Sequence, residues 1–315
     1  MGRHPPSPAS SGEGEQPGKP FDKPWRSWSD QIRLLESRGM IIADRSSAEA
    51  FLSHVNYYRF SGYVLAFERS RHAFVPGTTF EQVRDAYEFD RVLRDLVTES
   101  LELVEVDART AIGYHFGRSY GAFGHTEPAN FFATFRHRDW IDKLNAEATR
   151  SNEQFVRHYR RTYSGFPDLP TWIATEVMSF GAISIMFRGM RRDDQREIAR
   201  RYRIQPGFLA SWLHHLVYVR NVCAHHSRVW DRVWAIKPDL PPLPAWSSPL
   251  LPGNDRLFVT LLILRRLLAR CPSIAPFDAA WKSRVERHLS VPPDVADPLI
   301  RMGLHRDWKS HPLWA

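Results

Sequence analysis

The stretch that decides the fold is residues 80–116, FEQVRDAYEFDRVLRDLVTESLELVEVDARTAIGYHF. It contains no proline, and its only glycine, Gly113, lies near the end. Its apolar and small residues recur with the 3.6-residue period of a helix, and charged residues fill the other faces. The members of the apolar stripe are Phe89, Val92, Leu93, Leu96, Ser100, Leu103 and Val104. The pattern predicts one long amphipathic helix with one buried stripe.

Helical patterning extends outward from this segment in both directions. Helices are predicted at 29–38, 46–54, 140–163, 171–190, 194–202, 208–223, 255–271 and 277–289. Residues 55–67, VNYYRFSGYVLAF, carry the aromatic and β-branched residues of a buried turn or short strand, with a helix as the alternative. No continuous strand alternation is found. The sequence therefore predicts an all-α fold.

Two segments stand apart from this helical pattern. Residues 1–22 are rich in Pro, Ser, Gly and Glu and have almost nothing to bury, so we expect a disordered tail. Residues 237–254, KPDLPPLPAWSSPLLPGN, hold six prolines and predict an extended loop. We expect residues 23–315 to form one domain that includes this Pro-rich loop.

The composition is that of a globular protein with a basic balance. The 315 residues carry a formal net charge of +8, with a sequence pI of about 9.7. Two cysteines cannot form a disulfide framework, which favours a cytoplasmic location. The most apolar helical stretch, residues 257–264, is far shorter than the roughly 20 residues that span a bilayer. Neither a signal peptide nor a membrane partner is expected.

Arginine accounts for most of the positive charge, and it is clustered. Seven arginines and three acids lie between residues 188 and 203, and further clusters lie at 157–161 and 220–232. A solvated surface explains any one cluster. Together they favour a polyanionic partner, because the planar guanidinium grips phosphate at two points. We expect RNA contacts from Arg191, Arg192, Arg196, Arg228 and Arg232.

The segment RNVCAH, residues 220–225, carries the candidate chemistry. Asn221 and His225 are four residues apart on a predicted helix, so the Asn amide is within reach of the imidazole. Arg220 and His225 are about 140° apart around the helix axis. A histidine can move the proton of an RNA 2′-hydroxyl or of the leaving 5′-oxygen, and a guanidinium can stabilise phosphoryl charge. This chemistry needs no metal or cofactor and yields a 2′,3′-cyclic phosphate.

Other interpretations of these residues stay open. The pairs His214-His215 and His225-His226 beside Cys223 suggest a metal site, although no companion Cys pair exists. Cys223 is either a nucleophile or a small buried thiol. The long helix and residue 176 supply charges that either brace Arg220 or are simply solvated. These are Glu105, Asp107, Arg109 and Glu176.

The chain resembles the Abi-like family of bacterial abortive-infection proteins, within the HEPN superfamily. The resemblance lies in blocks from residue 23 to the C-terminus, among them HVNYYRFSGY, LPTWIATEVMSFGAIS, RNVCAHHSRVWDR and MGLHRDWKSHPLW. In that family RN-x-x-A-H is associated with metal-independent RNA cleavage and phage defence, and it matches Arg220, Asn221 and His225. Asp231 stands where the family more often has Asn.

This resemblance implies a HEPN-type helical bundle with additional N- and C-terminal helices, and an active homodimer with paired motifs. We therefore expect an endoribonuclease in which His225 is the general acid/base, Arg220 stabilises charge and Asn221 orients the site. The alternative is a non-catalytic RNA-binding or toxin-regulating HEPN module. A toxic nuclease must be restrained, so we also expect a regulatory partner. Either an RNA or a protein would fit the basic surface.

Overall fold

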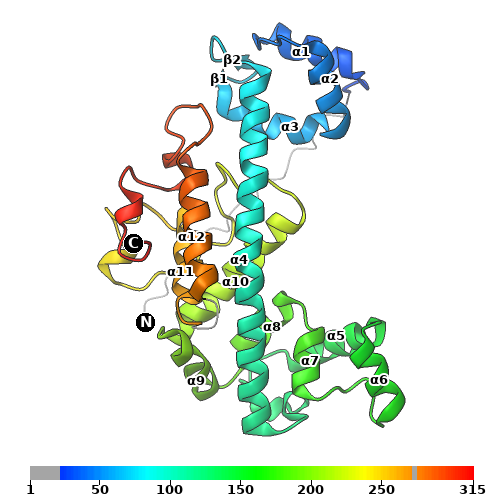
Figure 1. The fold of residues 1–315 in the computed structure, drawn as a ribbon. Coiled ribbons are helices and arrows are strands. Elements are labelled where there is room, and N and C mark those ends of the chain that lie inside the picture. Colours follow the sequence, from blue (N-terminus) through cyan, green and yellow to red (C-terminus); the bar gives the residue numbers. More distant parts are fainter. Residues whose placement is uncertain (1–21, 272–274) are drawn as a thin grey trace, which may run out of the picture.

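One helix runs the length of the molecule in the computed structural model, which describes residues 22–271 and 275–315 (Figure 1). This helix, α4, spans Phe80–Tyr120 and has 41 residues, or about 60 Å. It begins with a capping box, in which the Thr79 hydroxyl accepts from the Gln82 amide and the Gln82 side chain accepts from the Thr79 amide. The predicted long helix is confirmed. The predicted disordered tail, residues 1–22, lies outside the described residues except for Asp22.

The predicted apolar stripe of α4 is buried at Phe89, Leu93, Leu96, Ser100 and Val104. Leu103 is partly buried. Val92 lies at the edge of the stripe, where 36% of it is exposed. Further buried positions lie on other faces of α4, because helices pack around it on several sides.

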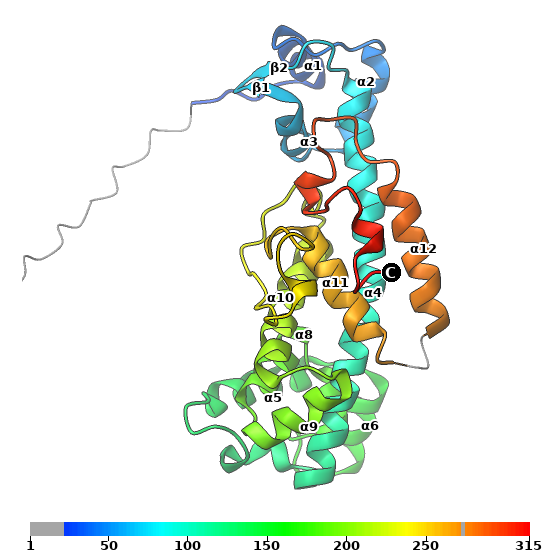
Figure 2. The same ribbon diagram turned by 90° about the vertical axis from the view of Figure 1, so that its left-hand side faces the viewer.

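Three short helices and a two-stranded antiparallel pair cover the N-terminal end of α4 (Figures 1 and 2). They are α1 (Trp28–Ser37), α2 (Arg45–His54), α3 (Tyr57–Val64), β1 (Glu68–Ser70) and β2 (Ala73–Phe74). The helical alternative for residues 55–67 is therefore correct and the short strand is wrong. Asn56 decides this, since its side chain accepts from the Tyr58 amide and starts α3.

Five helices gather at the C-terminal end of α4. They are α5 (His137–Arg150), α6 (Gln154–Thr162), α7 (Thr171–Val177), α8 (Phe180–Gly189) and α9 (Arg192–Tyr202). Helix α7 packs against α4 at Gly113, where a Cβ atom would lie 2.8 Å from the Thr175 hydroxyl. Only glycine permits this close approach, which brings α7 and the chain entering α8 against α4.

Two predicted helices are each interrupted. The helix predicted at 140–163 is broken after Arg150, because Ser151 is extended and its hydroxyl accepts from the Glu153 amide. The helix predicted at 171–190 is broken after Val177, because the Ser179 hydroxyl caps a new helix at the Ala182 amide. Both interruptions come from a serine that bonds nearby backbone in place of the helix ladder.

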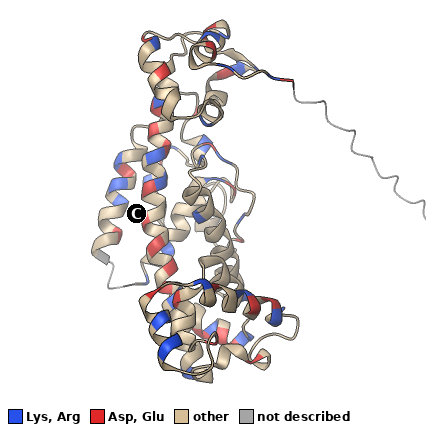
Figure 3. Ribbon diagram, turned by 90° about the vertical axis from the view of Figure 1, so that its right-hand side faces the viewer, with Lys and Arg blue, Asp and Glu red and all other residues tan. Residues whose placement is uncertain are grey.

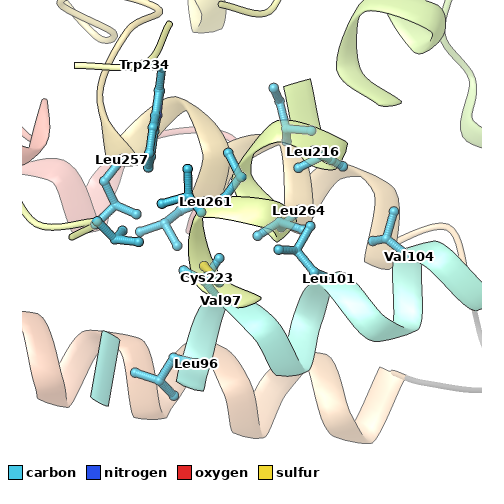
Figure 4. Packing of buried hydrophobic residues seen from close by; sticks show 14 of the residues in the cluster. Leu96, Val97, Leu101, Val104, Leu216, Cys223, Trp234, Leu257, Leu261 and Leu264 are labelled. Carbon is cyan, nitrogen blue, oxygen red and sulfur yellow. The ribbon is translucent and has the colours of Figure 1, made fainter. Parts of the chain in front are cut away.

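Helices α10 (Pro206–Ala224), α11 (Leu257–Leu268) and α12 (Ala275–Leu289) pack along the middle of α4. Figure 4 shows the core between them, with Leu101 and Val104 of α4 facing Leu216 of α10 and Leu264 of α11. The Pro-rich segment 237–254 is a loop whose one helical piece is the 3₁₀ turn Pro244–Trp246.

The all-α prediction is confirmed in the described residues, where the only paired strands are β1 and β2. In the same residues, no helix has the length and apolar character needed to cross a bilayer.

Candidate functional site at the C-terminal end of helix α10

Helix α10 exposes the RNVCAH residues by burying its other face. Its apolar residues pack into the core through Leu213, Leu216, Val219, Val222 and Cys223. On the last two turns, the exposed residues are Arg220, Asn221 and Ala224, followed by the cap residue His225. The three predicted catalytic residues therefore lie together on one exposed helix end.

The end of α10 has the hydrogen bonds of a Schellman motif. The His226 amide donates to the Cys223 carbonyl at 2.9 Å, and the Ser227 amide donates to the Val222 carbonyl at 2.9 Å. His226 occupies the position that usually holds glycine, with a φ of 53°. The chain therefore reverses direction directly after His225, which holds that side chain at the helix terminus.

Arg220 faces the long helix α4. Its Nε lies 3.8 Å from Oε2 of Glu105, whose side chain is only 14% exposed. Glu105 also accepts from Arg109 Nη2 at 2.9 Å, and the same nitrogen donates to the Met178 carbonyl at 3.1 Å. Glu105 is thus shared between two guanidinium groups, and Arg109 ties the site to the chain entering α8.

The other charges considered as braces are placed elsewhere. Asp107 accepts from the Tyr202 hydroxyl at 2.6 Å and pairs with Arg201, both on α9. Glu176 is exposed and forms no ion pair with the described residues. Of the acidic residues weighed from sequence, the structure brings only Glu105 to Arg220.

The predicted contact between Asn221 and His225 is not a side-chain hydrogen bond. Within residues 22–271 and 275–315, Asn221 bonds His225 through the backbone, where the His225 amide donates to the Asn221 carbonyl at 3.0 Å. The Asn221 side-chain oxygen instead accepts from Arg220 Nη1 at 3.5 Å. Asn221 therefore contacts the guanidinium of the site rather than its imidazole.

The arginines that follow the motif contact the protein itself. Arg228 donates to the Gly62 carbonyl of α3. Arg232 donates to the Tyr218 hydroxyl and to the Arg228 carbonyl, both at 3.2 Å. Both guanidinium groups lie beside the motif, and each already holds the loop after α10 in place.

The other three arginines expected to bind RNA lie at or near the start of α9, which packs against the C-terminal part of α4. Asp194 of α9 accepts from the Tyr120 hydroxyl and contacts His115, each at 2.8 Å, which seats this helix on the C-terminal part of α4. His115 follows Glu105 by ten residues, or about 15 Å along the helix. Arg191, Arg192 and Arg196 are exposed there. Along α4 itself positive and negative residues are interspersed (Figure 3).

Two alternatives remained from the sequence, a metal site at the histidine pairs and a nucleophilic thiol at Cys223. His215 is fully buried, with its Nδ1 2.7 Å from the Ile236 carbonyl and its Nε2 2.9 Å from the Thr260 hydroxyl. No group of three or more potential metal ligands occurs among the described residues. Cys223 is buried beside Val97 (Figure 4), and burial raises the pKa of its thiol to about 12. The structural interpretation of Cys223 is confirmed.

The residues that hold the chain after the motif have no recognisable signal in the sequence pattern. Arg59 of α3 donates to the His226 carbonyl. Asp90, a fully buried residue of α4, accepts from the backbone amides of Val229 and Trp230. Asp231, noted as a departure from the resembling family, binds Arg256 at 3.1 Å and Arg301 at 3.0 Å.

A family model described as Abi-like protein matches residues 50–231, more than half of the chain. The match starts within α2, contains all of α4 and α10, and ends directly after the segment that Asp90 holds. The chain belongs to the Abi-like protein family. Searches of curated proteins and of solved structures gave no match. The site and its environment thus lie inside the part of the chain that defines the family.

Proposed function

We propose that this Abi-like protein is a metal-independent endoribonuclease of the HEPN type that acts in abortive-infection defence against phage. The observation that carries the proposal is the joint exposure of Arg220, Asn221 and His225 at the end of an otherwise well-packed helix. These residue types match the demands of RNA cleavage through the 2′-hydroxyl. Family membership supports the role in abortive infection.

Each residue has a distinct part in the proposed reaction. His225 takes the proton of the 2′-hydroxyl or protonates the leaving 5′-oxygen, and the 2′-oxygen displaces the 5′-oxygen from phosphorus. Arg220 stabilises the charge on the non-bridging phosphoryl oxygens. Asn221 and Glu105 position the Arg220 guanidinium. The products are a 2′,3′-cyclic phosphate and a 5′-hydroxyl.

We propose that RNA also contacts Arg192 and Arg196 of α9 and the N-cap residue of this helix, Arg191, which are all exposed. Helix α9 contacts α4 at His115, about 15 Å along the helix from Glu105, and this separation suits a strand that extends beyond the cleaved bond. Arg228 and Arg232 contribute positive potential beside the motif, while their guanidinium groups hold the loop.

The test is RNA cleavage by the purified protein in EDTA, with product ends identified by mass spectrometry. We expect cyclic phosphate ends in EDTA, and a loss of rate of about 100-fold or more in His225→Ala and in Arg220→Ala. Arg220→Lys should also be defective, because lysine keeps the charge but loses the two-point grip on phosphate. His54→Ala, an exposed histidine at the end of α2, is the matched control.

Two results would contradict the mechanism. Loss of cleavage in EDTA that a divalent ion restores would indicate metal-dependent chemistry. RNA binding without cleavage, unchanged by His225→Ala, would favour the non-catalytic RNA-binding module.

A further inference from the structure

The carboxyl group of Asp90 lies buried where α3, α4 and the segment after α10 meet. It accepts from the Tyr63 hydroxyl at 2.6 Å, from the Trp230 amide at 2.6 Å and from the Val229 amide at 3.1 Å. Arg94 Nη1 also donates to it. A carboxylate has about four acceptor positions, so these donors fill it completely.

All four neighbours of Asp90 donate hydrogen bonds, so the acceptor-only carboxylate is the form that fits them. Burial raises the pKa of Asp90, and this rise is opposed by Arg94, Tyr63 and the two amides. A buried ion pair of this kind adds little net stability, because desolvation offsets most of the attraction. Its distinctive property is geometric, since it holds donors from three elements in one fixed arrangement.

The two amides bound by Asp90 belong to a segment tied down along its length. His226 is bound through its carbonyl by Arg59, and Arg228 reaches back to the Gly62 carbonyl. The Ser227 amide closes the helix on Val222 at 2.9 Å. Residues 226–230 are therefore attached to α3, α4 and α10, and His225 is the residue directly before them.

We propose that Asp90 is a positioning residue for His225. It acts through the Val229 and Trp230 amides, which fix the path of the chain that leaves the end of α10. For its catalytic readout this inference rests on the proposed ribonuclease function. Its structural readouts do not depend on activity.

The test compares Asp90→Asn with the wild-type protein. Asparagine keeps the shape but presents an amide donor to groups that are themselves donors. Losing hydrogen bonds to a charged acceptor should speed hydrogen exchange in a peptide covering residues 225–230 by about tenfold or more. The ring Cε1–H resonance of His225, assigned by its loss in His225→Ala, should shift or broaden. Exchange in α11 should stay unchanged.

In the cleavage assay, kcat should fall by about 100-fold, because a displacement of about 1 Å has that effect on catalysis. KM should stay near the wild-type value. The matched control is Asp95→Asn, an exposed carboxylate of α4 that lies 3.7 Å from Arg91. It should leave exchange, resonance and kcat unchanged.

Tyr63→Phe removes one donor and keeps the carboxylate with both amides, so it should give smaller changes in the same direction. If Asp90→Asn does not fold, Tyr63→Phe provides the test in its place. Unchanged exchange at 225–230 and an unchanged His225 resonance would overturn the inference. Faster exchange spread evenly over the whole chain would also overturn it, as the mark of a purely structural role. If both local changes occur but wild-type protein cleaves no RNA, the proposed function fails and the positioning role stands.

Discussion

At the scale of single residues, His226 shows how the site is held at the end of a helix. With a φ of 53°, it occupies the left-handed region at the position where most helices place glycine. An L-residue there costs roughly 1–2 kcal/mol through the contact of Cβ with the carbonyl oxygen. The bond from Arg59 to the His226 carbonyl offsets part of this cost.

We predict that His226→Gly raises the free energy of unfolding by about 1 kcal/mol, because glycine removes the Cβ contact. The backbone bonds of the helix end, including the one from Arg59, stay available. RNA cleavage should persist, because the proposed chemistry uses His225. Urea denaturation measures the first effect and the cleavage assay measures the second. A destabilised variant, or one that has lost cleavage, would assign the His226 side chain a role of its own.

The sequence motif drew attention to Arg220, Asn221 and His225 but not to the residues that support them. The structure exposes these three side chains at the end of α10. Asp90 could not be assigned this way, because its partners lie 27 positions earlier at Tyr63 and about 140 positions later at Trp230. A buried carboxylate with distant backbone partners leaves no periodic signal. The same holds for the bond from Arg59 to His226.

At the scale of elements, helix content was predictable and helix interruption was not. The pattern at 80–116 is long and regular, and α4 follows it to Tyr120. The breaks at Ser151 and Ser179 depend on one hydroxyl each. The Ser151 hydroxyl accepts from the Glu153 amide just before α6, and the Ser179 hydroxyl caps α8. Ser179 was the better signal, since a cap residue before an apolar run is a start signal for a helix.

Helix α10 is joined to its neighbours by His215, which bonds the Ile236 carbonyl and the Thr260 hydroxyl of α11. The carbonyl can only accept, so Nδ1 carries the proton and Nε2 accepts from threonine. Burial lowers the pKa of His215 to about 4. A second buried histidine, His125, also has its pKa lowered by burial to about 4.

These lowered pKa values predict a loss of stability in mild acid. The unfolded chain binds protons near pH 6.5 while the folded chain resists them until about pH 4, so the stabilisation is complete above pH 6.5 and is lost as the pH falls through this window. Each histidine contributes up to about 1.4 kcal/mol per pH unit. Urea denaturation between pH 7.5 and 5 measures this slope. His215→Gln should be less stable at pH 7.5 and have a shallower slope, and an unchanged slope would contradict the assignment.

At the scale of the whole molecule, α4 is the common support of the site. Glu105 meets Arg220 on its central part, Asp90 holds the following segment nearer its N-terminal end, and α9 with its exposed arginines lies on its C-terminal part. Because one continuous helix carries all three, their relative positions are fixed by its regular rise. The apolar pattern that predicts α4 therefore also predicts the helix that supports the candidate site.

The active form should be a homodimer with a composite site, and the arrangement within one chain supports this. Five residues of an ideal helix separate two side chains by about 140°, which places Arg220 and His225 on different sides of the helix end, and Arg220 faces Glu105. Cleavage needs a base for the 2′-hydroxyl and an acid for the 5′-oxygen, and one motif supplies one histidine at the helix end. A two-fold axis beside this end would place both copies of Arg220 and His225 around one phosphate.

Mixing wild-type chains with an excess of His225→Ala chains tests this arrangement. If two histidines serve each phosphate, activity per wild-type chain should collapse as mixed dimers replace wild-type pairs. The same excess of His54→Ala chains should cause no such loss, because the proposed chemistry does not use that exposed histidine at the end of α2. Sedimentation at the assay concentration establishes whether dimers are present. Activity that follows only the amount of wild-type chain, or a monomeric mass at that concentration, would show that a single motif is sufficient and that His225 completes the proton transfers with water.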